Sequence, residues 1–154
     1  MPLLLAIHLL SVVIWVGGMF FAVVILGRAT KELEIPQFVP LWGRVLKKFF
    51  HLVWIAVFLL PLTGYGMIHT YFASFRPLPH YISIMATLGV GMCLVFIFTY
   101  VTAYQRFSYM LQELLYPEAG LYMQKIRLFI LINLLLGITT IVVATTGRII
   151  GWCC

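Results

Sequence analysis

Histidine is the residue type in this sequence best suited to bind a metal, and His8 occupies an unusual place for one. It interrupts the run LLLAIHLLSVVIWVGGMFF, which is otherwise apolar and long enough to cross a bilayer. An ionisable side chain at that depth costs free energy, so we expect it either to serve a function or to bond a neighbouring helix. Neutral imidazole binds haem iron, copper and zinc, so His8 indicates a site for one of these metals.

The small and polar residues of this first run share one helical face. His8, Ser11, Trp15, Gly18 and Ala22 follow one another at helical spacing, while leucine, valine, isoleucine and phenylalanine occupy the other positions. In lipid such a face points into a helix bundle. A second stripe, near the end of the chain, has the same character and consists of Asn133, Gly137, Thr140, Ala144 and Arg148.

Three further ionisable residues are candidates for the same site. His69 and His80 are expected in the same half of the bilayer as His8, and either could supply a second ligand. Arg148 could pair with a carboxylate such as a cofactor propionate, or could reach outward to lipid headgroups. His51 is expected near the opposite boundary and is interpreted as an interfacial residue. The methionines are interpreted as packing residues.

Hydrolytic and carboxylate-based chemistry is not predicted. The acidic residues Glu32, Glu34, Glu113 and Glu118 all fall in expected loops, so no span carries a carboxylate for proton-coupled or cation-coupled transport. The same placement disfavours a hard-metal site, which needs oxygen ligands. No glycine-rich phosphate loop is present.

Composition predicts the elements that must position these side chains. The chain of 154 residues is 64% apolar and 9% charged, which is typical of a membrane protein. Runs at about 2–26, 49–72, 80–104 and 128–149 are long enough to span a bilayer. We therefore predict an all-α integral membrane four-helix bundle forming a single domain over residues 1–154. The first span is not expected to be a cleaved signal peptide.

Charge placement predicts the orientation. The first and third loops carry most of the basic residues: Arg28, Lys31, Arg44, Lys47, Lys48, Arg106, Lys125 and Arg127. Positively charged loops stay in the cytoplasm, so both termini and the loop around Arg76 are expected on the periplasmic side of a bacterial inner membrane. These cations flank the spans and form no separate basic domain, so nucleic acid is not an expected partner.

Three local patterns refine the expected elements. The stretch PQFVPLWGRVLKKFF is interpreted as an interfacial lead-in to the second span. The third span is expected to continue past Tyr104 as a cytoplasmic helix until YPEAG ends it, with Pro117 and Glu118 in the first turn of the next helix. Cys153 and Cys154 are interpreted as an incidental tail, with a soft metal ligand pair as the alternative.

The motif HLLSVVIWVGGMFF resembles the first helix of the CopD-like membrane proteins, a group that includes the HemJ-type protoporphyrinogen oxidases. The resemblance rests on His8, Trp15, Gly17 and Gly18, on LTGYGM in the second span, and on KIRLFILINLLLGITTIVVATTGR in the last. It implies copper transport for one branch and b-type haem bound through the first-helix histidine for the other. HemJ-type proteins carry a lysine in the third helix, whereas residues 80–104 here contain none.

Together these observations predict a membrane protein that binds one haem b and serves electron transfer or other redox chemistry in the periplasmic half of the bilayer. His8 is the expected axial ligand, His69 or His80 the second, with Arg148 on a propionate and Trp15 and Gly18 lining the site. Two alternatives remain open. One is a copper-handling protein using His8, methionines and optionally the terminal cysteines, with His8 and His69 as the candidate metal ligands; the other is a cofactor-free subunit of a larger membrane complex. The sequence does not decide whether the protein is an oxidoreductase or whether it forms a homo-oligomer. It also does not identify the membrane or periplasmic redox partner.

Overall fold

Helices make up every element in residues 2–72 and 79–149, the part of the chain that the computed structural model describes. The first rod consists of α1 (Pro2–Phe20), a π-helical segment η1 (Phe21–Leu26) and a short α2 (Gly27–Ala29). The second rod is α3 (Ile35–Phe72). The third consists of α4 (His80–Thr99), a second π-helical segment η2 (Tyr100–Tyr104) and α5 (Gln105–Gln112), and the fourth is α6 (Tyr116–Ile149).

All four rods are long and apolar enough to cross a membrane. The stretches that meet this description are Pro2–Ala29, Ile35–Thr70, His80–Gln112 and Tyr116–Gly147. The prediction of an all-α chain with four such helices is therefore confirmed. The loop around Arg76 and the Cys153–Cys154 pair lie outside the described residues, as does the side chain of Arg148.

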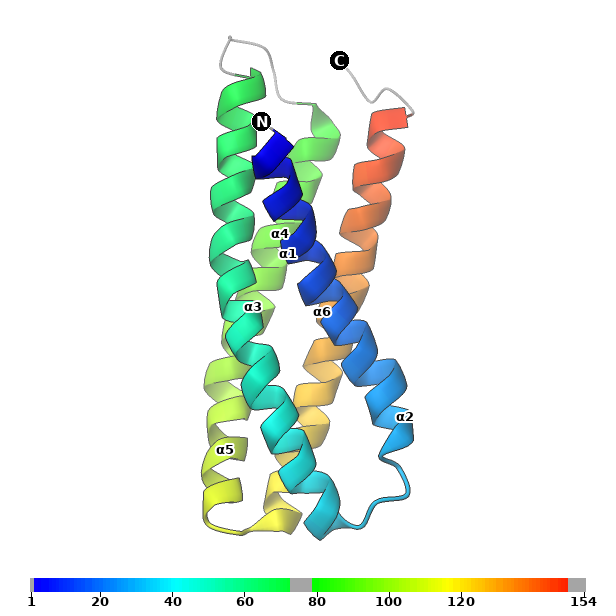
Figure 1. Cartoon of the computed structure of the whole chain (residues 1–154), viewed down its shortest axis with the longest axis vertical. Helices are drawn as coiled ribbons and strands as arrows, with labels where there is room; N and C mark the ends of the chain where they lie inside the picture. The colour runs from blue at the N-terminus through cyan, green and yellow to red at the C-terminus, as the bar shows by residue number, and fades with distance from the viewer. Residues whose placement is uncertain (1, 73–78, 150–154) are drawn as a thin grey trace.

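The rods run antiparallel to their chain neighbours (Figure 1). Pro2 and the last turn of α6 lie at one end of the bundle, here named the terminal end. The connections 30–34 and 113–115 lie at the opposite end, here named the loop end. The closest packing joins α1 to α3 and α4 to α6, whereas α3 and α4 touch only sparsely. The bundle is therefore two helix pairs laid against each other.

The second rod is one continuous helix of 38 residues, which joins the expected interfacial lead-in to the span without a break. Its buried apolar positions explain the continuity, because they follow one helical stripe across the expected boundary: Val39, Trp42, Leu46, Phe50, Val53 and Val57. Burying this stripe against the bundle stabilises the helix on both sides of the boundary. Pro40 and Pro61 are both accommodated inside it.

The break between α5 and α6 comprises residues 113–115 and lies just before YPEAG, which the sequence analysis expected to end the helix and which instead begins α6. Leu114 adopts a left-handed backbone conformation with φ of 59°, which ends the preceding helix. The Leu115 N–H then donates to the Met110 carbonyl at 2.9 Å. Pro117 and Glu118 follow in the first turn of α6, where a missing N–H is tolerated and a negative charge is favourable.

The apolar core is concentrated toward the loop end. Buried apolar side chains begin at Trp15 in α1, lie between Val39 and Val57 in α3, and end at Leu134 in α6. Within the described residues, the segments nearest the terminal end (2–14, 58–70, 80–91 and 135–147) contain no fully buried apolar side chain. His8 therefore lies in the more loosely packed half of the bundle.

Candidate functional site

The site begins with a hydrogen bond between the first two rods. The Nδ1 atom of His8 in α1 lies 2.8 Å from the hydroxyl oxygen of Thr63 in α3. His8 is half-buried and Thr63 is buried, so the bond is shielded where α1 and α3 pack together. Thr63 follows Pro61 by two residues on the terminal side of the core, at the depth where the sequence placed His8.

The partners of Thr63 determine which nitrogen of His8 carries the proton. The Thr63 hydroxyl donates its single proton to the Leu59 carbonyl, with an oxygen–oxygen distance of 2.6 Å. Only its lone pairs then remain for His8, so Nδ1–H of His8 donates and Thr63 accepts. In a neutral imidazole the other ring nitrogen, Nε2, keeps its lone pair. The local structure thus presents an imidazole oriented through Nδ1 with Nε2 free to bind a metal.

A glycine makes room for this ring. A Cβ atom added to Gly64 would lie 3.6 Å from Cε1 of His8, at ordinary van der Waals contact. A larger side chain at position 64 would extend into the imidazole. Ser11, one turn further along the His8 face, is buried and donates its hydroxyl to the Ile7 carbonyl at 2.8 Å. The face predicted from helical spacing is therefore the face that α1 turns toward the bundle.

The other predicted site residues lie apart from His8. His69 is exposed, and its ring lies 6.3 Å from that of Tyr65, which is 70% exposed. Five residues of helix separate His69 from Gly64, which places it about 140° around α3 from the turn that holds His8. His80 is exposed at the start of α4. The structure thus brings His8 to Thr63 and Gly64, and leaves His69 and His80 on exposed surfaces.

Trp15 and Gly18 are packing residues in this arrangement. Trp15 is 2% exposed and meets Phe96 of α4 edge-on, with ring centroids 6.1 Å apart. A Cβ atom added to Gly18 would overlap the Phe49 ring of α3. Gly18 therefore permits close approach of α1 and α3, and the space beside it is filled by an aromatic side chain.

Replacement of Gly18 is expected to destabilise the bundle. Gly18→Leu forces a side chain into the space of the Phe49 ring, and overpacking of this kind costs about 1–3 kcal/mol. Gly17→Leu is the matched control, because an added Cβ there meets nothing within 4 Å. Thermal unfolding of the detergent-purified variants should show a lower midpoint for Gly18→Leu than for Gly17→Leu. Equal midpoints would show that α1 does not present this face to α3.

The stripe predicted in α6 is partly buried and holds an unpaired polar atom. Asn133 is 4% exposed, and its Oδ1 accepts no hydrogen bond from the described residues. The gap beside it, between Trp15 and Phe96, has a volume of about 10 Å³. The space beside Gly137, one turn further along α6, is occupied by the side chains of Val16 and Met92. At the depth of the core this stripe therefore serves helix packing, and the gap that adjoins Asn133 is far smaller than a cofactor.

A second feature, absent from the sequence interpretation, is a cavity of about 430 Å³ at the loop end. It lies between α3 and the η2–α5 segment and includes His51, which the sequence analysis treated as interfacial only. A spacing signal was present in the sequence: Tyr100, Tyr104, Ser108 and Gln112 recur every four residues and so share one face of a helix. Opposite them, Lys47 and His51 are also one turn apart.

Comparisons with known proteins identify no relative. No family model matches the chain, and the comparisons with curated proteins and with solved structures found no match. The function is therefore argued from the geometry of His8 and of the loop-end cavity.

Proposed function

We propose that this chain is a membrane haem protein in which His8 is the axial ligand of a b-type haem. The observation that carries the proposal is the 2.8 Å contact between His8 Nδ1 and the Thr63 hydroxyl, which itself donates to Leu59. This arrangement favours the tautomer in which Nδ1 carries the proton and Nε2 keeps its lone pair. A histidine that ligates a metal through one ring nitrogen commonly donates the N–H of the other ring nitrogen to an oxygen, which fixes the tautomer and the ring orientation. Thr63 supplies that oxygen.

A lone histidine favours haem over a copper ion. Within the described residues, no three histidine, cysteine or acidic side chains gather where they could hold a metal. A bare copper ion needs several protein ligands, whereas a porphyrin brings four nitrogens and asks the protein for one or two. Copper handling by His8 and His69 is thus the weaker proposal, because His69 lies on another face of α3.

Haem held by imidazole supplies one-electron transfer between its ferrous and ferric states. The residues of this chain contribute the rest: His8 binds, Thr63 orients His8, and Gly64 leaves space for the ring. Their position in the loosely packed half of the bundle supports electron transfer or other redox chemistry at the terminal end. A membrane or periplasmic redox partner would act at that end.

An absorption spectrum of the detergent-purified protein tests the proposal. The haem protein should show a Soret band and, after reduction with dithionite, sharp α and β bands. Metal analysis of the same sample measures copper. Copper without a Soret band would favour the copper-handling alternative. A protein containing neither would be the cofactor-free bundle, with the His8–Thr63 bond acting only to join two helices.

We further propose that the loop end faces the cytoplasm of a bacterial inner membrane, with both termini periplasmic. Eight of the ten lysines and arginines belong to the first loop or to the loop-end halves of the rods. Basic residues are retained in the cytoplasm. In a cysteine-free background, Lys31→Cys and Lys125→Cys should react with a membrane-impermeant maleimide only after the cells are permeabilised. Arg76→Cys, as the control, should react in intact cells. Labelling of Lys31→Cys in intact cells would reverse the orientation.

A further inference from the structure

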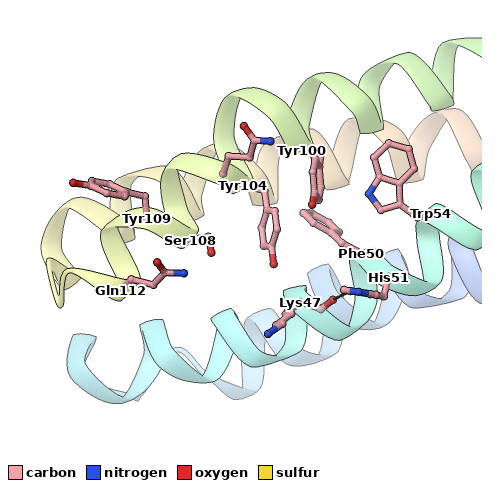
Figure 2. Close-up of a pocket in the computed structure, with 10 residues that line it drawn as sticks. Lys47, Phe50, His51, Trp54, Tyr100, Tyr104, Ser108, Tyr109 and Gln112 are labelled. Atoms are coloured by element: carbon pink, nitrogen blue, oxygen red, sulfur yellow. Dashed lines mark hydrogen bonds between the residues drawn. The ribbon is translucent and has the colours of Figure 1, made fainter.

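The cavity at the loop end combines an aromatic wall with polar side chains (Figure 2). Its volume is about 430 Å³, within the range of small-molecule sites in proteins. The residues that line it come from α3 and from the η2–α5 segment, and they are Lys47, Phe50, His51, Trp54, Tyr100, Tyr104, Gln105, Ser108, Tyr109 and Gln112. None of these residues belongs to the His8 site.

Four aromatic rings form a continuous wall on the side of the cavity nearer the terminal end. Phe50 meets Tyr104 at 4.7 Å between ring centroids, Tyr104 meets Tyr100 at 5.2 Å, and Tyr100 meets Trp54 at 5.5 Å. The π-helical turn η2 carries both tyrosines, and such turns occur frequently at functional sites. Flat rings are what a wall of this kind packs against best.

The polar side chains of the cavity are rich in hydrogen-bond donors. Figure 2 shows the Tyr104 hydroxyl directed into the space between α5 and α3, with Ser108 and Gln112 on one side of it and Lys47 and His51 on the other. His51 Nδ1–H donates to the Lys47 carbonyl at 3.0 Å, so in a neutral imidazole Nε2 is left as an acceptor. The donors that remain for a ligand are the Lys47 ammonium, the Tyr104 and Ser108 hydroxyls and the Gln112 amide. The lining contains no carboxylate. A matching ligand therefore presents acceptor oxygens.

We propose that this cavity binds the head group of a membrane-soluble quinone. A quinone is a flat ring for the aromatic wall, and its two carbonyl oxygens accept hydrogen bonds from donors such as Tyr104 and Lys47. The wall also continues into the apolar part of α3, because Trp54 stacks on the exposed Phe58 at 6.1 Å between centroids. An isoprenoid tail can follow Phe58 into the hydrocarbon region while the ring remains in the cavity.

An anionic phospholipid headgroup fits the same place less well. Its phosphate would use Lys47 but would leave the four aromatic rings, which meet one another edge-on or tilted, without a planar partner. Quinone binding goes beyond the proposed haem function and does not depend on it, because none of the cavity residues contacts His8. Loss of one activity in a variant therefore leaves the other measurable.

Fluorescence quenching of the purified full-length protein by a decyl-tailed benzoquinone tests the proposal. Trp54 lines the cavity, so saturable quenching is expected on titration. Tyr104→Phe keeps the ring and removes the hydroxyl, and should raise the Kd about fivefold. Ser108→Phe fills the cavity and should abolish the saturable component.

Two control variants and a competing ligand complete the experiment. Tyr65→Phe alters an exposed tyrosine of α3, and Thr102→Phe adds a ring to an exposed position of η2. Neither residue lines the cavity, so both variants should bind the benzoquinone with the Kd of the wild-type protein. Matching size-exclusion and thermal-unfolding profiles establish that the variants are folded. Quenching that never saturates, or that Ser108→Phe leaves unaltered, would overturn the proposal. So would binding of dihexanoyl phosphatidylglycerol that depends on Tyr104 in a protein that binds no quinone.

Discussion

On the proposed haem function, the His8→Ala protein is expected to lose haem, and with it the Soret band. Alanine offers no atom that can ligate iron, and no other histidine in the described residues lies on the α3 turn that receives His8. The measurement is the haem-to-protein ratio of the purified variant, obtained from the pyridine haemochrome spectrum. Full haem content with an unchanged spectrum would show that His8 only joins two helices.

Variants of residues near His8 and far from it test whether the loss of haem is specific to the His8 site. Thr63→Val removes the oxygen that accepts from Nδ1 while keeping the side-chain shape, and should weaken haem binding by about 10- to 100-fold. His51→Ala is the matched control, because His51 lies at the loop end. His69→Ala and His80→Ala should also retain haem, since both side chains are exposed. If His69→Ala alone shifts the spectrum, His69 is the second axial ligand.

Trp42→Ala is expected to produce the largest loss of stability. Trp42 is 0% exposed, its Nε1–H donates to Thr30 at 3.1 Å, and the Arg127 guanidinium lies 5.7 Å from its ring centroid. The side chain thus joins the first loop, α3 and α6. Truncation of a fully buried tryptophan costs about 3–5 kcal/mol. Unfolding in mixed micelles of increasing SDS content, followed by circular dichroism, measures the free energy of unfolding.

Two substitutions separate the contributions of the Trp42 side chain. Trp42→Phe keeps a ring and removes the N–H, so it should cost about 1–2 kcal/mol. Tyr65→Ala alters an exposed aromatic residue and should stay within about 0.5 kcal/mol of the unchanged protein. A Trp42→Ala protein as stable as Tyr65→Ala would show that the loop end does not hold the bundle together.

Much of the fold could be predicted because single helices are encoded locally. Apolar length predicted the four long helices, and Pro117 with Glu118 predicted where the last one begins. Helical spacing also predicted the inward face of α1, where Ser11 and Trp15 are buried. The pairing of α1 with α3 could not be predicted, because a helical period identifies a buried face and not the helix that covers it.

The candidate sites likewise combine features that local sequence predicts with features that only the three-dimensional structure reveals. His8 was found because one imidazole in an apolar run is conspicuous, but its partner Thr63 is 55 residues away and no local pattern connects the two. The loop-end cavity was missed because Lys47 and His51 beside Phe50 were interpreted as headgroup contacts. Only the approach of η2 and α5 to α3 makes these residues the second wall of a cavity.

Buried apolar side chains are concentrated at the loop end, so the helices should separate more easily at the terminal end. Opening the loop end exposes Trp42, Leu46 and Phe107, which are fully buried, whereas separating segments 58–70 and 135–147 exposes no fully buried apolar side chain. Local opening requires least free energy where the fewest apolar contacts are broken. The terminal end is therefore where a planar molecule as large as a porphyrin would enter between the helix pairs with the smallest loss of buried apolar contacts. Assembly of such a protein would need no unfolding of the chain.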